Sequence, residues 1–167
     1  DLVRWMVGRE VNQQFPRRAI AIGDVRLRVD HFTLHDPSDL SRCVVNDVSF
    51  DVCAGEILGV AGLQGSGNSE LLNGLFGTYG ALAEGAVSID GEPFRDRSPR
   101  RSIKRGVALL TNDRKATGLV MQMGITHNMT LAALEKFSPG GWLRPDAEGQ
   151  EARRRSDSLR LKATSLM

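Results

Sequence analysis

The sequence lacks several features that would point to a membrane, nucleic-acid or metal function. No apolar run approaches the roughly 20 residues that a membrane-spanning helix needs. The 22 basic and 20 acidic residues leave a net charge of only +2, so charge gives no argument for nucleic acid or a membrane surface as a partner. The histidines are scattered, which argues against a metal site among His31, His35 and His127.

Cysteine is also scarce. Cys43 and Cys53 are the only two in the sequence, and both lie in strand-like sequence without CxxC spacing. We expect free, partly buried thiols in a reducing compartment. A disulfide between them is the alternative, although nothing in the sequence requires one.

The length and composition are those of a globular domain. With 167 residues, the chain is long enough for one domain with a hydrophobic core. Hydrophobic residues make up 41% and charged residues 25%, which is an ordinary balance. The sequence opens with Asp1 rather than methionine, so we expect it to be a piece of a longer protein.

Two kinds of strand pattern occur. Residues 24–32 and 43–52 alternate apolar with polar side chains, which predicts a hairpin or small antiparallel sheet. Residues 56–62, EILGVAG, are apolar nearly throughout, and VALL at 107–110 is similar. Such runs favour parallel strands that are buried on both faces. A further strand with a tight Asp-Gly turn is predicted within residues 85–94.

Helical patterns alternate with these strands. Capping signals predict that Ser98 and Thr126 begin helices and that Gly77 ends one. The predicted helices cover residues 69–77, 98–106, 126–137 and 146–161. Strands and helices that alternate around a glycine-rich loop predict an α/β fold that is preceded by an antiparallel subsheet.

The stretch GLQGSGNSE, residues 62–70, lies between a predicted buried strand and an amphipathic helix. It matches the spacing of the P-loop pattern G-x-x-x-x-G-K-[ST] except at the lysine. Glycines let the backbone turn tightly and aim N–H groups inward, and the following helix adds its positive end. We predict that the loop binds nucleotide phosphates and that Ser69 contacts Mg²⁺. The predicted nucleotide-binding residues are Gly62, Gly65, Ser66, Gly67, Asn68, Ser69 and Glu70.

Asn68 stands where the P-loop pattern has lysine. Its neutral amide replaces a full positive charge, and charge-assisted hydrogen bonds are roughly twice as strong as neutral ones. Glu70 adds a carboxylate that would repel a nearby phosphate. We therefore predict nucleotide binding with little hydrolysis, and we assign no catalytic residue. The alternative is a glycine-rich strand-to-helix turn with no ligand.

Longer stretches of the sequence resemble one family. DVSFDVCAGEILGVAGLQGSGNSELLNGLFG resembles the start of an ABC-transporter nucleotide-binding domain. More narrowly, it is similar to the second such domain in the tandem ATP-binding subunits of bacterial monosaccharide importers, the ribose, galactose, arabinose and xylose class. LVRWMVGRE is similar to the segment that leaves the first domain, and DRKATGLVMQMGITHNMTLAAL and SLRLKATSL resemble later segments. The resemblance covers nearly the whole chain, and MVGRE combined with DRKATGL is specific to this subfamily.

The resemblance implies a domain organisation. Residues 1–22 would be a linker from a preceding domain, and residues 23–167 the first half of an ABC-type nucleotide-binding domain, truncated before the signature motif. The α/β core would then be incomplete, because the family's later parallel strands follow that point. The family's second P-loop commonly lacks lysine and often has arginine there, so Asn68 departs even from that pattern, whereas Glu70 fits it.

The resemblance also implies cofactors and partners. ATP and Mg²⁺ would be bound, with Ser69 and Asn112 as metal contacts, since Asn112 stands where the family usually has glutamate before DRK. The parent protein would lie peripherally on the cytoplasmic face of the inner membrane and couple ATP binding and hydrolysis to the import of simple sugars; the fragment alone would be inactive. Its partners would be transmembrane permease subunits, a second nucleotide-binding domain and, indirectly, a periplasmic sugar-binding protein, with no nucleic acid.

Two other functions compete with this interpretation. A non-catalytic P-loop scaffold or regulatory module that binds no nucleotide would also fit the degenerate loop. A small kinase fits less well, because an antiparallel pattern precedes the loop and the lysine is missing. Phe32 and His35 are the nearest counterparts of the aromatic residue that stacks on adenine in many ABC domains, and we expect Phe32 to pack in the core instead.

Overall fold

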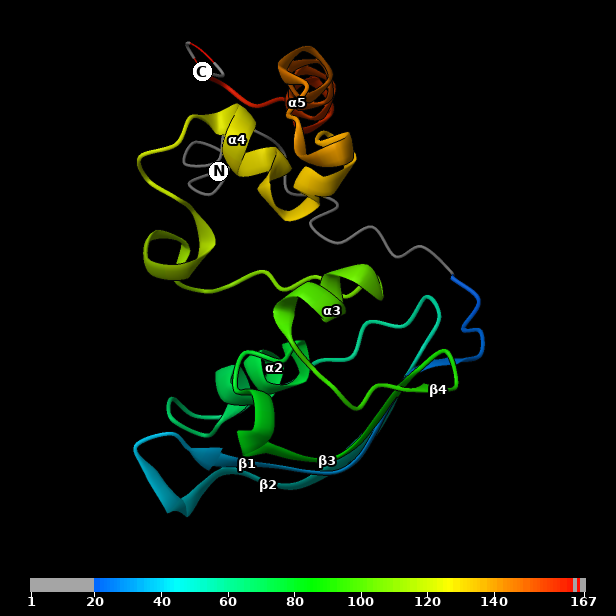
Figure 1. Cartoon of the computed structure of the whole chain (residues 1–167). Helices are drawn as coiled ribbons and strands as arrows, with labels where there is room; N and C mark the ends of the chain where they lie inside the picture. The colour runs from blue at the N-terminus through cyan, green and yellow to red at the C-terminus, as the bar shows by residue number, and fades with distance from the viewer. Residues whose placement is uncertain (1–19, 164, 166–167) are drawn as a thin grey trace, which may run out of the picture. The chain divides into compact units, whose positions relative to one another are not determined.

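The structure is a computed structural model that describes residues 20–163 and residue 165 (Figure 1). The chain divides into two compact units, which we call the first unit, ending at Pro99, and the second unit, beginning at Arg100. Each is described by itself. The segment LVRWMVGRE, residues 2–10, and most of the predicted linker lie outside the described residues.

The first unit is built on an antiparallel sheet. β1 (Val25–Asp36) and β2 (Asp39–Cys53) form a long hairpin, and β3 (Ala83–Ile89) pairs with the other edge of β1. The short β4 (Glu92–Pro93) follows β3 through a turn at residues 90–91, so the strand order is β2-β1-β3-β4. The predicted antiparallel subsheet and its Asp-Gly turn are confirmed.

A bulge crosses three neighbouring strands. His31 on β1, Asp47 on β2 and Gly85 on β3 all have positive φ, and the register of the sheet shifts beside them. A Cβ atom on Gly85 would collide with the carbonyl oxygen of His31, so the close approach of β3 to β1 requires glycine. The His31 Nδ1 and Asp47 Oδ1 atoms lie 2.6 Å apart and tie two of the bulged positions together.

The core of the first unit lies between β1 and the helix α2 (Asn68–Phe76). Val29, Phe32 and Leu34 are fully buried. A Cβ atom on Gly74 would come within 2.9 Å of Phe32 Cζ, so α2 rests directly on this ring, and Figure 1 shows the helix across one face of the sheet. Phe32 is therefore a core residue, as predicted.

A buried arginine closes the same core. The Arg97 guanidinium lies 5.3 Å from the centre of the Phe32 ring. Its Nη2 donates to the carbonyl oxygen of Ala83 at 2.6 Å, and its Nη1 donates to that of Gly85 at 3.3 Å. Burial lowers the pKa of Arg97. Arg97 thus fastens the segment after β4 to the start of β3, just beyond the 3₁₀ turn η1 (Gly80–Leu82).

The second unit is helical. Its elements after α3 (Pro99–Lys104) are the π-helical turn η2 (Arg114–Gly118), α4 (Ile125–Thr130), the 3₁₀ segments η3 (Leu131–Lys136) and η4 (Pro139–Gly141), and α5 (Pro145–Leu159). The predicted helices at 98–106 and 146–161 are confirmed. α4 packs against α5, where Thr130 Oγ1 lies 2.5 Å from Oε1 of the buried Glu148. Among the described residues, no helix combines the length and apolar character that crossing a membrane requires.

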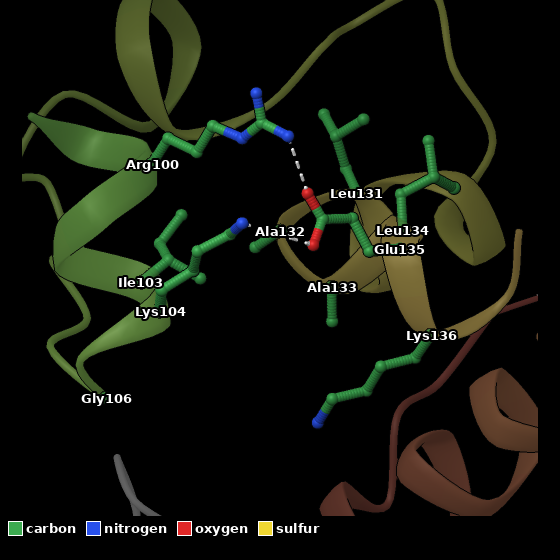
Figure 2. A pocket seen from close by; sticks show the side chains of 10 residues that line it. All are labelled: Arg100, Ile103, Lys104, Gly106, Leu131, Ala132, Ala133, Leu134, Glu135 and Lys136. Carbon is green, nitrogen blue, oxygen red and sulfur yellow. Dashed lines mark hydrogen bonds and ion pairs between the residues drawn. The ribbon is translucent and has the colours of Figure 1, made fainter. Parts of the chain in front are cut away.

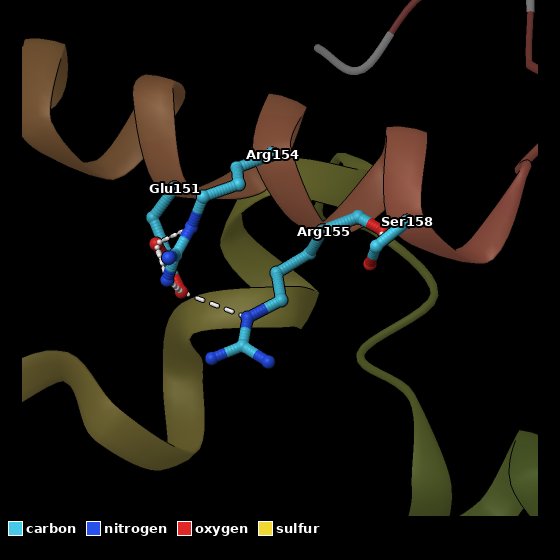
Figure 3. A network of polar contacts seen from close by, with 4 residues as sticks. All are labelled: Glu151, Arg154, Arg155 and Ser158. Carbon is cyan, nitrogen blue, oxygen red and sulfur yellow. Dashed lines mark hydrogen bonds and ion pairs between the residues drawn. The ribbon is translucent and has the colours of Figure 1, made fainter.

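One face of α5 carries a small ion network (Figure 3). Glu151 accepts hydrogen bonds from Arg154 Nε at 2.9 Å and from Arg155 Nε at 2.8 Å. These bonds, that from Arg154 first, lower the pKa of Glu151 to about 2. Because both arginines are largely exposed, the network contributes little to folding.

The two predicted buried strands are wrong. Residues 56–62 and 107–110 form no strand, and Ile57 and Leu110 are 94% and 96% exposed. A strand needs a hydrogen-bonded neighbour, and the sheet of the described residues contains no partner for either segment. The parallel part of the α/β core is therefore not formed by the described residues, and the sheet is incomplete, as predicted.

The predicted helix at 126–137 also differs in detail. α4 begins at Ile125 after Gly124, and Thr126 is buried inside the first turn rather than capping it. The helix ends at Thr130, whose Oγ1 is within hydrogen-bonding distance of the carbonyl oxygen of Thr126, at 3.0 Å. Such back-bonding by threonine bends helices. The chain continues as η3, in which Ala133 leaves helical geometry.

The cysteine prediction holds in part. Both thiols are free, as expected, and Cys53 is half-buried. Cys43 is exposed rather than partly buried, because it lies near the turn of the β1–β2 hairpin.

Candidate functional site

The glycine-rich loop of residues 62–70 joins the end of the hairpin to α2. Gly65 and Gly67 have φ of +81° and +88°, a region that side-chain-bearing residues rarely adopt. The Ser66 N–H donates to the carbonyl oxygen of Leu63 at 3.0 Å and closes the turn between them. The loop therefore has the tight, glycine-dependent backbone that the sequence predicts.

Two predicted side chains fold back over the start of this loop. A Cβ atom on Gly62 would collide with Ser66 Oγ and lie 2.9 Å from Asn68 Nδ2. Only a residue without a side chain leaves space for these two polar groups. The structure thus brings Gly62, Ser66 and Asn68 together, and it shows that the Asn68 amide lies over the loop.

Gly67 fixes the position at which α2 begins. It is buried, and a Cβ atom on it would collide with the carbonyl oxygen of Val44 on β2. The loop therefore packs directly against the hairpin at this position. No side chain caps the helix, and the hydrogen bond from Leu71 N to Gly67 O, 2.8 Å long, closes its first turn. The amides of residues 68–70 precede that bond and have no acceptor within the helix. They carry the positive end of the helix dipole.

Ser69 and Glu70 lie in this first turn. Ser69 is exposed, and its carbonyl oxygen accepts a hydrogen bond from Asn73 Nδ2 at 2.8 Å. Glu70 is half-buried near Tyr79. Burial first, and then the charges of Glu70 and Asp36, raise the pKa of the Tyr79 hydroxyl. Two carboxylates thus act on Tyr79, Glu70 from the first turn of α2 and Asp36 from the hairpin.

Asn112, the other predicted metal contact, belongs to the second unit. It is exposed in the bend before η2. The next residue, Asp113, accepts hydrogen bonds at Oδ1 from Lys115 N at 3.1 Å and Ala116 N at 2.9 Å, which orders the turn that follows. Because Ser69 and Asn112 lie in different units, their pairing on one metal ion stays a prediction.

The loop offers a phosphate group shape and dipole, but no cation. Its uncapped helix start, its left-handed glycines and the hydroxyls of Ser66 and Ser69 suit phosphate oxygens. No residue of 62–70 is basic. For Mg²⁺, the loop itself supplies one hydroxyl at the P-loop position, Ser69. The loop can therefore offer backbone amides and hydroxyl groups to a nucleotide phosphate, but it lacks the positive charge that a lysine would supply.

A sequence comparison decides the family. The family model of the ABC transporter matches residues 45–165, which include the loop and most of the described chain. The chain belongs to the ABC transporter family. Its fold class is accordingly that of the ABC-type P-loop NTPases, here with an incomplete sheet.

Curated relatives match this ABC transporter chain along almost its full length. The ribose import ATP-binding protein RbsA of Geobacillus kaustophilus is 39% identical over 99% of the chain and 32% of its own length. The xylose import ATP-binding protein XylG of Burkholderia cenocepacia is 41% identical over 97% of the chain and 31% of its own length. The xylose import ATP-binding protein XylG of Brucella abortus is 37% identical over 100% of the chain and 33% of its own length. The chain thus spans about a third of the length of these relatives.

Sequence reasoning missed the role of Asn128 in the ABC transporter chain. Its Oδ1 accepts from Val120 N at 2.8 Å, and its Nδ2 lies 3.1 Å from Val120 O and 3.0 Å from Met123 O. One side chain therefore holds residues 119–124 in a fixed turn. Apolar side chains of this turn remain exposed, including Met121 at 65%. The asparagine in the GITHNMT run was the available signal, since asparagine commonly closes turns through backbone bonds.

A cavity of about 620 Å³ lies beside α3 and η3 in the second unit (Figure 2). Ile103, Leu131 and Leu134 give it an apolar lining. At its rim, Glu135 pairs with Arg100 Nη2 at 2.9 Å and, more loosely, with Lys104 Nζ at 3.9 Å. The Arg100 bond and the charge of Lys104 lower the pKa of Glu135. The second unit therefore presents a concave surface with an apolar floor and a charged margin.

Proposed function

We propose that this chain is part of the ATP-binding subunit of an ABC importer for simple sugars. Residues 23–167 are proposed as the first half of a nucleotide-binding domain and residues 1–22 as a linker from a preceding domain. The similarity of nearly the whole chain to ribose and xylose import ATP-binding proteins supports this assignment. The family match over residues 45–165 lies within this proposed domain.

The loop of residues 62–70 is proposed to bind the phosphates of ATP. The observation that carries this proposal is the glycine cradle, Gly65 and Gly67 at positive φ, at an uncapped helix start. The backbone amides, together with Ser66 and Asn68, would hold phosphate oxygens, and Ser69 and Asn112 would contact Mg²⁺. ATP bound with Mg²⁺ supplies a phosphoryl group for hydrolysis. Asn68 brings no charge to that group and Glu70 brings the wrong sign, so this site is proposed to bind nucleotide and hydrolyse little of it.

Substitution of Asn68 tests the proposal directly. Asn68→Lys should tighten binding of MgATP about tenfold, equivalent to about 1.4 kcal/mol, because a charge-assisted bond replaces a neutral one. Isothermal titration calorimetry at low ionic strength measures the dissociation constant. The matched control is Gln150→Lys, which adds the same charge to an exposed position on α5 and should leave affinity unchanged.

The outcomes separate this proposal from its alternative. Equal affinity of wild type and Asn68→Lys would place the nucleotide away from the loop. No binding by either protein would favour a P-loop scaffold that holds no nucleotide. Equal tightening by Gln150→Lys would mean a general charge effect and would also contradict the proposal.

The proposed partners follow from the importer assignment. They are transmembrane permease subunits, a second nucleotide-binding domain of the same chain or a dimer mate and, indirectly, a periplasmic sugar-binding protein. The subunit would lie peripherally at the cytoplasmic face of the inner membrane. The exposed apolar turn at 119–124 and the apolar cavity of the second unit support a protein partner. The 167-residue chain by itself is proposed to show no ATP turnover.

A further inference from the structure

Another cavity of the second unit lies between α5 and the segments that precede it. Its volume is about 340 Å³, and α4, η3 and α5 all contribute to its wall. Small-molecule sites usually measure roughly 300 to 1,000 Å³, so this cavity suits a small ligand. The packing of α4 against α5, where Thr130 bonds to the buried Glu148, holds two of its walls together.

The interior of this cavity is mostly apolar and includes an aromatic ring. Met129 and Ala133 line it on the side of α4 and η3, and Phe137 follows directly after η3. Ala152 and Leu159 line it from α5. A thioether and a phenyl ring both make favourable contacts with another aromatic ring. The wall therefore suits a small apolar body, an aromatic one in particular.

Two cations and one carboxylate also line the cavity. They are Lys136, Arg155 and Glu151. Glu151 is already paired, since it accepts hydrogen bonds from Arg154 and Arg155, and these bonds, that from Arg154 first, lower its pKa to about 2. Among the residues that the structure describes, Lys136 has no acidic partner. The cavity therefore carries a net positive charge that an anionic group of a ligand would balance.

Arg155 is held in place with its terminal nitrogens free. Its Nε atom donates to Glu151 Oε1 at 2.8 Å, and Figure 3 shows both Nη atoms turned away from Glu151. Within the described part of the chain, no acceptor bonds to either Nη atom. The side chain is 62% exposed, so a solute can reach it from solvent. Two neighbouring N–H groups of a guanidinium match the two oxygens of a carboxylate, and such bidentate bonds are stronger than neutral ones.

We propose that this cavity binds a small carboxylate with an aromatic body, an arylalkanoate. Arg155 binds the carboxylate through its two Nη atoms, and Lys136 adds positive charge from η3. The aromatic ring lies against Met129 and Phe137. The loop of residues 62–70 belongs to the first unit, so this binding does not depend on the nucleotide.

The test titrates hydrocinnamate into the 167-residue chain, isotope-labelled at its methionine methyl groups. We expect the NMR signal of Met129 to shift until saturation, whereas those of Met121 and Met123, on the exposed turn at 119–124, should not move. Hydrocinnamyl alcohol has the same carbon skeleton without the charge and should bind roughly tenfold more weakly. Equal binding of acid and alcohol, or equal shifts of all three methionines, would contradict the proposal.

Variants of the charged groups and of the apolar wall locate the site. Arg155→Gln should weaken hydrocinnamate binding roughly tenfold and leave the alcohol unchanged, because it removes the charge and the paired donors. Arg153→Gln removes the same charge from an exposed position of α5 that does not line this cavity, and it should change neither ligand. Ala133→Leu should weaken both ligands, because the larger side chain fills the cavity.

A second charge variant keeps the test decisive if Arg155→Gln does not fold, which circular dichroism would show. Lys136→Gln should weaken hydrocinnamate binding several-fold and leave the alcohol unchanged. Absence of any Met129 shift in the wild-type chain would overturn the proposal. So would an equal loss of affinity in Arg153→Gln and in the variants of the two lining cations.

Discussion

Gly67 is the residue at which the hairpin, the loop and α2 meet. Its left-handed backbone turns the chain into the helix, and its carbonyl oxygen accepts the hydrogen bond that closes the first helical turn. Its missing side chain leaves space for the Val44 carbonyl. Gly65 shares the backbone conformation, but open space surrounds it. A side chain at Gly65 would therefore cause backbone strain alone, whereas a side chain at Gly67 would cause both backbone strain and a clash.

Alanine substitutions should show that difference. Gly65→Ala should lower the free energy of unfolding by about 1 kcal/mol, the strain of a left-handed alanine. Gly67→Ala should lower it by roughly 2 kcal/mol or more, because the clash with β2 adds to the same strain. Urea denaturation followed by circular dichroism measures both. Equal losses would mean that the hairpin does not hold the loop.

His31 and Asp47 form a hydrogen-bonded pair in the bulge. The hydrogen bond to Asp47, with its charge, raises the pKa of His31. A raised histidine pKa means that the pair stabilises the fold fully below the ordinary value of about 6.5 and loses this effect as pH rises through the raised value.

Removal of the aspartate charge should therefore change the titration. In Asp47→Asn, the pKa of His31 should return toward its ordinary value, and the decrease of stability with rising pH should become smaller. NMR titration of the ring protons measures the pKa, with His127 in the same spectrum as the control. A wild-type His31 that titrates at the ordinary value would refute the pairing.

At the scale of elements, sequence patterns predicted a strand or helix correctly where it packs against a segment close to it in the sequence. The alternation in residues 24–32 and 43–52 predicted β1 and β2, because each side chain is sorted between core and solvent within one hairpin. The apolar runs at 56–62 and 107–110 failed, because a doubly buried strand depends on partners distant in the sequence.

Some features of the candidate site could likewise be predicted from the sequence, and others could not. The glycines of the loop were predictable from spacing, since only glycine suits their backbone. The placement of the Asn68 amide over Gly62 was not, because it depends on side-chain rotamers within the loop. Nor was the pinning of residues 119–124 by Asn128, which joins groups eight positions apart through side-chain atoms.

The hydrogen bonds of Asn128 to Val120 and Met123 hold the 119–124 turn, so their removal should loosen the turn. Asn128→Ala removes the bonds to Val120 and Met123, each worth about 1 kcal/mol. Asn128→Asp keeps the acceptor for Val120 N and loses the donors. We expect proteinase K to cut within 119–123 fastest in the alanine variant and at an intermediate rate in the aspartate variant, as mass spectrometry of the fragments would show. Cleavage at the hairpin turn, residues 37–38, serves as the control and should not change.

At the scale of the whole molecule, several apolar side chains of segments outside the sheet are exposed among the described residues. Ile57, Leu63 and Leu110 are between 88% and 96% exposed, and such residues favour self-association. The described residues therefore combine a well-packed antiparallel sheet with apolar segments whose side chains are exposed to solvent.

Polar substitutions should suppress that association. Ile57→Ser combined with Leu110→Ser should reduce binding of the dye anilinonaphthalene sulfonate and the fraction of large species in sedimentation velocity. The free energy of unfolding should change by no more than about 0.5 kcal/mol, because exposed side chains contribute little. Leu71→Ser, at a buried position of α2, is the contrasting control and should destabilise the fold. A large loss of stability in the double variant would mean that these segments are buried in solution.

The bulge across β1, β2 and β3 has a practical consequence for altering the length of this chain. His31, Asp47 and Gly85 anchor the pairing of the strands between the hairpin turn and the glycine loop. Extra residues inserted at Pro37–Ser38 would therefore extend the tip without shifting the alignment nearer the loop. A peptide tag or fluorophore could be grafted there, whereas a one-residue insertion between Asp47 and Cys53 would exchange the two faces of β2 and displace the loop it supports.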